Sequence, residues 1–147
     1  MRPKAQILIV PLRTFLVEDN KAFLDYVCSV VRAHPDLQIV GEAHNGIDAV
    51  ERATALKPDL IILDIGLPGM NGIEAARQIR NLVPVAKIIF LTQESSPEIV
   101  SEALGLGAWG YVLKCSAAHD LQAAVQGVID GNRFVSEALK ARPAAAD

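Results

Sequence analysis

The stretch Leu60-Ile61-Ile62-Leu63-Asp64-Ile65-Gly66-Leu67-Pro68-Gly69-Met70-Asn71-Gly72 decides the fold of this chain. It places an unbroken apolar run before an acidic residue and a loop rich in glycine, proline and asparagine, which are turn formers. Apolar runs without alternation are typical of parallel strands that helices cover on both faces. The stretch therefore predicts a buried parallel strand that ends at Asp64, on the sheet edge where α/β proteins bind ligands.

Strand-like and helix-like segments alternate on both sides of this stretch. The expected strands are Arg13–Val17, Leu37–Ala43, Leu60–Leu63, Lys87–Leu91 and Tyr111–Leu113. The expected helices are Lys21–Ala33, Gly46–Leu56, Ile73–Arg80, Pro97–Leu106 and Ala117–Asp130. Strict alternation implies an α/β fold with a parallel sheet, right-handed crossovers and helices on both faces.

Capping residues mark three of the helix starts, and two ends of the chain fit no element. Asn45, Ser96 and Ser116 are predicted N-caps. Residues 1–12, which include an apolar run, are interpreted as a leader or extra segment before a domain at 13–131. Residues 132–147 have no expected partner element and are interpreted as the start of a linker or tail.

Length and composition predict one domain and exclude several function classes. The chain has 147 residues, 51% of them hydrophobic, with a mean hydropathy of +0.28. A net charge of -3 and a pI of about 5.6 make it a poor candidate for direct DNA contact. No apolar stretch approaches the roughly 20 residues of a membrane span. The two cysteines form no CxxC pair and no export signal is evident, so we expect a cytoplasmic location.

Charged and hydroxyl side chains stand where the predicted strands end. Glu18 and Asp19 follow the first strand, and Asp64 follows the third. Thr92 follows the fourth strand, and Lys114 follows the fifth. Because the carboxyl ends of parallel strands share one edge of the sheet, these side chains are expected to converge.

Such a constellation suits a divalent cation and a phosphoryl group. Like charges about 4 Å apart repel by about 1 to 4 kcal/mol, so three carboxylates need a cation among them. Lys114 supplies one charge, and Mg²⁺, which prefers carboxylates, waters and phosphate oxygens, would supply more. Asp64 is a possible nucleophile toward phosphorus. Alone, each acid is more often a turn or cap residue, Thr92 is a common strand residue and Lys114 is a solvated charge, so the coincidence carries the hypothesis.

Three motifs together resemble response-regulator receiver domains of two-component signalling. They are Val17-Glu18-Asp19-Asn20, Leu63–Gly72 and Gly110-Tyr111-Val112-Leu113-Lys114. The resemblance covers about Arg13 to Gly131. It implies a flavodoxin-like (CheY-like) doubly wound fold, (βα)5, with five parallel strands in the order 2-1-3-4-5. It also implies a signalling domain rather than an enzyme, which takes a phosphoryl group from a sensor histidine kinase.

The resemblance also implies roles for the residues at the strand ends. Asp64 would be the phosphoacceptor. Glu18, Asp19, Asp64 and the backbone carbonyl of Ile65 would hold Mg²⁺. The acidic side chains would thus serve both the metal and the phosphoryl group.

The same resemblance implies a switch on the neighbouring strands. Thr92 would be the switch hydroxyl, Lys114 the phosphate-contacting lysine and Tyr111 the switch aromatic. The hypothesis is that phosphorylation draws the Thr92 hydroxyl toward Asp64 and that Tyr111 then rotates inward. The surface around the last two helices would change, with dimerisation or release of an output domain as the readout.

The final third resembles the NarL/FixJ (LuxR-type) subfamily. The similar residues are Gly107–Lys114, Leu121, Ala124, Val125, Val128 and Gly131. Members of that subfamily usually carry a C-terminal helix-turn-helix, for which this chain is too short. DNA would then be a partner only through an absent domain, and a homodimer is possible. A stand-alone docking or phosphorelay module is the alternative.

Three further alternatives are distinguishable. Haloacid-dehalogenase-type enzymes need a second aspartate two residues after the nucleophile, where this chain has Gly66. Flavin or dinucleotide binders hold phosphate on a glycine-, serine- or threonine-rich loop after the first strand, where this chain has Glu18 and Asp19. A degenerate receiver that acts only as a docking domain would lack key residues that are present here.

Overall fold

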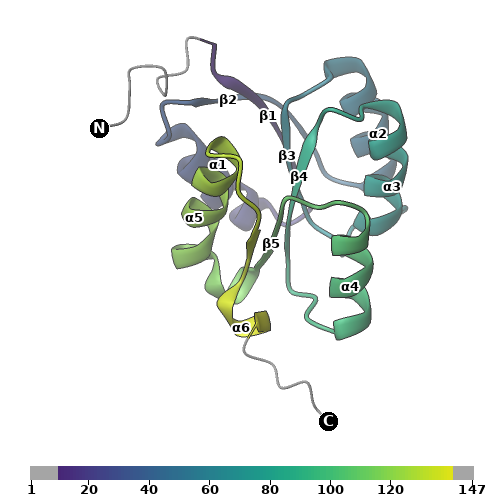
Figure 1. Ribbon diagram of the computed structural model, residues 1–147. Coiled ribbons are helices and arrows are strands. Elements are labelled where there is room, and N and C mark those ends of the chain that lie inside the picture. The colour runs from purple at the N-terminus through teal and green to yellow at the C-terminus, as the bar shows by residue number, and fades with distance from the viewer. Residues whose placement is uncertain (1–9, 141–147) are drawn as a thin grey trace.

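A computed structural model describes residues 10–140 and arranges them as a sheet between two layers of helices (Figure 1). The strands are β1 (Leu12–Val17), β2 (Leu37–Ala43), β3 (Leu60–Leu63), β4 (Lys87–Thr92), β5 (Gly110–Leu113) and β6 (Phe134–Val135). The helices are α1 (Lys21–Arg32), α2 (Gly46–Leu56), α3 (Gly72–Leu82), α4 (Pro97–Gly105), α5 (Ala117–Ile129), α6 (Glu137–Lys140) and the 3-10 turn η2 (Lys114–Ser116). Within the described range, no helix is both long enough and apolar enough to cross a membrane.

The sheet is entirely parallel, and its strand order is β2-β1-β3-β4-β5-β6. The predicted flavodoxin-like order 2-1-3-4-5 is confirmed, with one strand added at the β5 edge. The chain reverses its direction of winding between β1 and β3. In open α/β sheets such a reversal opens a crevice at the carboxyl ends of the strands.

Helices α1 and α5 cover one face of the sheet, and α2, α3 and α4 cover the other (Figure 1). All residues of β3 are buried, as expected for a central strand with helices on both faces. Neighbouring residues alternate between two apolar clusters: Phe15 and Ile61 face α2 and α3, whereas Leu16 and Ile62 face α1 and α5. The two clusters bury the central strands from both faces, and the loops that carry the site start at the carboxyl ends of these strands.

Side-chain caps fix most of the helix starts. The predicted N-caps Asn45 and Ser96 are confirmed, since their side chains accept the backbone N–H groups of Asp48 and Ile99. The prediction for Ser116 is wrong in one respect, because its hydroxyl makes no capping hydrogen bond. β5 leads into η2 there, and the Ser116 backbone is not in the extended conformation from which side chains usually cap.

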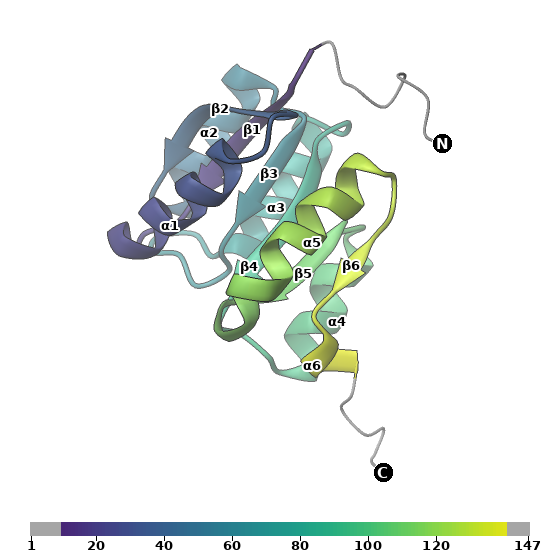
Figure 2. The ribbon, with the colours of Figure 1, turned by 90° about the vertical axis from the view of Figure 1, so that its left-hand side faces the viewer.

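The segment after α5 is part of the sheet, so the prediction that it has no partner element is wrong. Phe134 and Val135 pair in parallel with Gly110 and Tyr111 (Figure 2). A strand of two residues carries no hydrophobic period, which is why the sequence did not reveal it. Residues 1–9 and 141–147 lie outside the described part of the chain, and so do most of the predicted leader and the end of the predicted tail.

Candidate functional site

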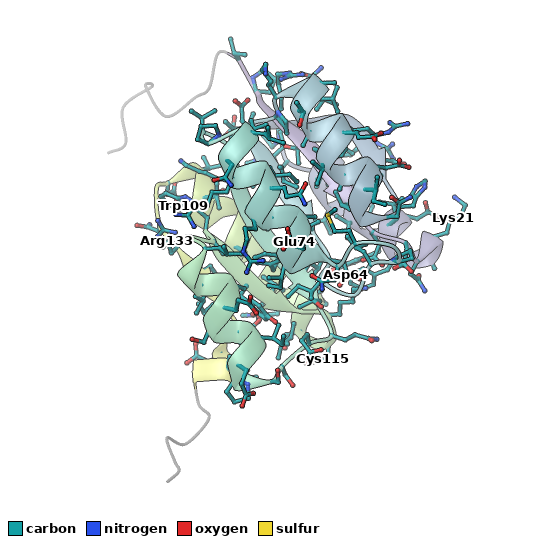
Figure 3. All side chains as sticks on the ribbon, turned by 90° about the vertical axis from the view of Figure 1, so that its right-hand side faces the viewer. Lys21, Asp64, Glu74, Trp109, Cys115 and Arg133 are labelled. Atoms are coloured by element: carbon teal, nitrogen blue, oxygen red, sulfur yellow. The ribbon has the colours of Figure 1, made fainter. Side chains whose placement is uncertain are left out.

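The loops that follow four strands line one open pocket of about 380 Å³ at the carboxyl edge of the sheet. The residues around this pocket are mostly polar or charged: Asp19, Asn20, Asp64, Gly66, Thr92, Gln93, Glu94 and Lys114. Figure 3 shows Asp64 and Cys115 at this end of the molecule, while Trp109 and Arg133 lie next to each other toward the opposite edge. The convergence predicted from the strand ends is therefore present in the structure.

Three carboxylates form the acidic part of the pocket. One oxygen from each of Glu18, Asp19 and Asp64 lies within 4.8 Å of the other two. Glu18 and Asp64 are buried, with 4% and 5% of their surface exposed, whereas Asp19 is exposed. Two buried carboxylates this close are stable only with a positive partner.

Lys114 is that partner in this structure. Its Nζ atom lies 3.0 Å from the Glu18 carboxylate and 3.1 Å from Oδ2 of Asp64. Burial lowers the pKa of the Lys114 ammonium, but the hydrogen bonds to the two carboxylates outweigh burial and leave this pKa above its ordinary value. The lysine is thus held charged, with its ammonium placed between both acids.

The ionised form of Glu18 is disfavoured despite this ion pair. Burial, reinforced by the charge of Asp64, raises the pKa of the Glu18 carboxyl above its ordinary value. Hydrogen bonds from Lys114 and from the backbone N–H of Asn20 oppose this rise without cancelling it. One lysine therefore does not fully compensate the acidic pocket, and a further cation would stabilise it.

The donor atoms fit a hard divalent cation. Carboxylate oxygens are the ligands that Mg²⁺ prefers, and Asp19 opens the cluster to solvent, where waters can complete an octahedron. The carbonyl oxygen of Ile65, however, already accepts the N–H groups of Leu67 and Gly72, each at 2.8 Å. Because both lone pairs are used, the implied role of this carbonyl is not supported, and the neighbouring Gly66 lines the pocket instead.

Thr92 and Tyr111 meet at the loop after β4. Thr92 is buried, and its hydroxyl oxygen accepts the backbone N–H of Glu94 at 3.3 Å. The Tyr111 ring is fully buried against Phe90, and its hydroxyl donates to the carbonyl of Glu94 at 2.7 Å. Burial raises the pKa of Tyr111 well above its ordinary value, so the hydroxyl stays protonated as a donor. The inward position of Tyr111 is therefore already adopted here.

Phe23 is a neighbour of the site that the sequence did not single out. The Lys114 Nζ atom lies 4.8 Å from the centre of the Phe23 ring, within the range of a cation–π contact. The N-cap bond from the Phe23 N–H to Asn20 fixes this ring at the start of α1. The available signal was position: Phe23 lies in the first helical turn after Glu18 and Asp19, at the same edge of the sheet.

Gly72 allows α3 to begin directly against the phosphoacceptor candidate. A Cβ atom at this position would lie 2.0 Å from the carbonyl oxygen of Asp64 and 2.7 Å from Cα of Ile65. Both neighbours are backbone atoms, which cannot rotate away. A glycine is therefore required there, and it brings the start of α3 close to the end of β3.

Comparisons with known proteins place this geometry in context. The profile described as "Response regulator receiver domain" matches residues 14–126. The nitrate/nitrite response regulator protein NarL of Escherichia coli (strain K12) is 36% identical over 129 residues, which cover 88% of this chain and 60% of NarL. The protein-glutamate methylesterase/protein-glutamine glutaminase 1 of Methanosarcina acetivorans is 40% identical over 126 residues, which cover 84% of this chain and 36% of the enzyme.

The solved structures include a close match to the whole fold. The crystal structure of a two-component response regulator of the LuxR family from Aurantimonas sp. SI85-9A1 superposes with a TM-score of 0.82 at 29% identity. The match covers 88% of this chain and 93% of that one. Against the two sequence relatives, by contrast, this chain spans only 60% and 36% of their lengths.

Proposed function

The chain belongs to the family of response regulator receiver domains, in its NarL/FixJ (LuxR-type) branch, and we propose that it accepts a phosphoryl group on Asp64 from a sensor histidine kinase. One observation carries this proposal: Asp19, Asp64 and Lys114 line a single open pocket at the carboxyl edge of the sheet, and the Glu18 carboxylate lies against all three. The pocket offers a nucleophile, a site for a divalent ion and a cation for the incoming phosphoryl oxygens.

In the transfer step, a carboxylate oxygen of Asp64 forms a bond to phosphorus as the P–N bond of the phosphohistidine breaks. The imidazole nitrogen keeps the electron pair of that bond. Glu18, Asp19 and Asp64 would hold Mg²⁺, with the carbonyl of the pocket-lining residue Gly66 as a further candidate donor. The ion, when bound, neutralises charge on the phosphoryl oxygens.

Lys114 has a second role in this proposal. Its ammonium bridges Glu18 and Asp64 at rest and turns to the phosphoryl oxygens once Asp64 carries them. The aromatic face of Phe23 keeps the ammonium above the pocket in both states. The lysine thus stabilises the acids first and the transferred group afterwards.

The switch passes through Thr92 and Tyr111. The phosphoryl group on Asp64 attracts the Thr92 hydroxyl, and the space that Thr92 leaves favours the inward ring of Tyr111. The Tyr111 ring is buried and its hydroxyl donates to the Glu94 carbonyl, and in this proposal the phosphoryl group stabilises that inward arrangement. As the Tyr111 ring settles inward, the surface formed by α4, β5 and α5 shifts between its two conformations.

The output of this switch is proposed from the relatives, of whose lengths this chain spans 60% and 36%. Transcription control by a C-terminal DNA-binding domain, with dimerisation of receivers, is the output proposed from relatives described as transcriptional regulatory proteins, as LuxR-family DNA-binding response regulators and as dimers bound to DNA. The methylesterase relative carries a matching segment beside a different activity, so receivers of this kind serve more than one output. The domain itself turns over no external substrate and works in the cytoplasm.

Intact-mass analysis tests the proposal. The protein is incubated with acetyl phosphate, with Mg²⁺ or with EDTA, and Asp64→Asn is compared with Asp25→Asn, whose side chain is 66% exposed on α1. The expected result is a Mg²⁺-dependent gain of one phosphoryl group in wild type and Asp25→Asn, and none in Asp64→Asn. No gain in any protein would favour the docking-only alternative.

A further inference from the structure

We propose that Ser136 and Asp120 are positioning residues for the phosphorylation site, because they fix the backbone from Tyr111 in β5 to Leu113, the residue directly before Lys114. This inference rests on the proposed function. It makes β6, which follows the last helix of the receiver, a working part of the site rather than a linker. Figure 2 shows β6 beside β5, with α5 next to it and α6 at the carboxyl end.

Ser136 is bonded on three sides. Its hydroxyl donates to Oδ2 of Asp120 at 2.8 Å and accepts the backbone N–H of Leu113 at 3.1 Å. Its own backbone N–H donates to the carbonyl of Tyr111 at 2.9 Å. Ser136 is fully buried and Asp120 is 5% exposed, so these bonds form away from water. Removing either side chain would leave a buried polar group without its partner.

The hydroxyl of Ser136 accepts a hydrogen bond that a longer β6 would accept through its backbone. The β5–β6 ladder ends at the pair of Tyr111 and Val135, where the chain turns into α6. The N–H of Leu113 lies beyond that point, and Leu113 is buried, so its N–H needs an acceptor. Ser136 supplies this acceptor at the residue immediately before Lys114.

Asp120 anchors the arrangement to α5. The burial of its carboxyl is more than offset by hydrogen bonds from His119 and Ser136, which leave the pKa of Asp120 below its ordinary value. The charged carboxylate therefore persists near neutral pH and holds the Ser136 hydroxyl in one orientation. That orientation directs the oxygen lone pairs of the hydroxyl toward Leu113.

The functional consequence follows from chain order. Lys114 directly follows Leu113, and Tyr111 lies two residues before it, so both groups share the short backbone segment that Ser136 holds. A shift of Lys114 toward a phosphoryl group strains the Leu113–Ser136 bond. The segment that leaves the receiver thereby responds to phosphorylation through main-chain contacts.

Phosphorylation kinetics test the positioning role. Initial rates with acetyl phosphate and saturating Mg²⁺ are measured well below the melting temperature for Ser136→Ala, Ser136→Thr and the exposed control Ser101→Ala on α4. We expect Ser136→Ala to be slower by about 3- to 10-fold, because it removes the buried hydrogen bond that holds Leu113 together with the bond to Asp120. Ser136→Thr, which keeps the hydroxyl, and Ser101→Ala should retain the wild-type rate. A Ser136→Ala variant that only melts earlier, with an unchanged rate, would overturn the proposal.

The pairing of the two side chains gives a second test that remains available if Ser136→Ala folds poorly. Asp120→Asn keeps an oxygen acceptor for the Ser136 hydroxyl, whereas Asp120→Ala does not. We expect Asp120→Asn to stay within about 2-fold of the wild-type rate, and Asp120→Ala to be as slow as Ser136→Ala and no slower when the two are combined. Additive rate losses would show two independent sites and contradict the shared role.

Hydrogen exchange separates this inference from the proposed function. Peptides covering 131–140 are compared in wild type with and without beryllofluoride and Mg²⁺, which mimic the phosphorylated state. Exchange in this segment should change by at least about 2-fold, alongside changes in β5. If mass analysis shows phosphorylation of Asp64 but exchange in this segment is unchanged, the proposed function stands and the role of β6 is wrong.

Discussion

At the scale of single residues, Lys114 and a divalent cation would compete for the same carboxylates. Lys114 sits between two buried acids, and Mg²⁺ would bind the same acids. The two cations repel each other, so each weakens the hold of the other on the pocket. When a phosphoryl group brings further negative charge, we expect Lys114 to give up its contacts with the two acids for contacts with the phosphoryl oxygens.

Replacing Lys114 tests this competition. Lys114→Met removes the resident cation, so we expect Mg²⁺ to bind several-fold to about tenfold more tightly. Titration calorimetry of the unphosphorylated protein measures the change. Lys21→Met is the matched control, because the Lys21 side chain is 87% exposed on α1. Weaker Mg²⁺ binding in Lys114→Met would contradict the competition.

The raised pKa of Glu18 predicts a pH dependence with a definite sign. Its folded-state pKa lies above the ordinary value of 4.5, so the folded protein holds this proton more tightly than the unfolded chain does. Its contribution to stability is therefore complete below pH 4.5 and is lost as pH rises through the raised pKa. Bound Mg²⁺ favours the ionised form and should reverse this loss.

Thermal unfolding across the same pH window provides the measurement. The melting temperature of wild type relative to Glu18→Gln should fall as pH rises above 4.5 without Mg²⁺, because the glutamine side chain of the variant cannot ionise. With saturating Mg²⁺ the difference should change sign, since the glutamine offers the ion no charge. A difference between the two proteins that stays constant with pH would show that the Glu18 carboxyl is unperturbed by folding.

At the scale of elements, glycine contacts decide how closely α3 approaches β3. Gly72→Ala would place a methyl group 2.0 Å from the Asp64 carbonyl oxygen. Overpacking of this kind should lower the free energy of unfolding by about 1 to 3 kcal/mol and slow phosphorylation of the displaced Asp64. Gly105→Ala is the control, because nothing lies within 4 Å of a Cβ there. Urea unfolding and phosphorylation rates compare the two variants, and equal effects would contradict this account.

The central strands were predictable because their sequences carry a strong signal. Leu60–Leu63 matches β3 residue for residue, and the predicted start at Arg13 misses the start of β1 by a single residue. Long apolar runs bounded by turn formers leave few alternatives. In contrast, β6 has two residues, and its place depends on Ser136 and on the ladder with β5, which are contacts across the fold.

Site residues follow the same division. Glu18, Asp64 and Lys114 could be found from their places after strands, since parallel topology brings such places together. The sequence could not show that the Ile65 carbonyl already accepts two N–H groups, or that the Phe23 ring lies beside Lys114. Both depend on how the loops close. The sequence therefore predicts which side chains meet, whereas the structure shows which of their atoms remain available.

At the scale of the whole molecule, the proposed chemistry lies at the carboxyl edge of the sheet, and its proposed transmission passes through β5 and β6. The order of strands places β1, β3, β4 and β5 side by side, so acids, hydroxyl and lysine arrive in one pocket from four loops. The sixth strand pairs with β5 beside this pocket, and α6 follows it. A receiver built in this way can be attached to different outputs, as its relatives illustrate.

The most direct test of the central claim is the position of the phosphoryl group. After reaction with acetyl phosphate and Mg²⁺, borohydride reduction converts an aspartyl phosphate into homoserine, which peptide mass spectrometry locates. The account predicts homoserine at position 64 alone. The reduced alcohol at Glu18 or Asp19, with Asp64 unmodified, would contradict it.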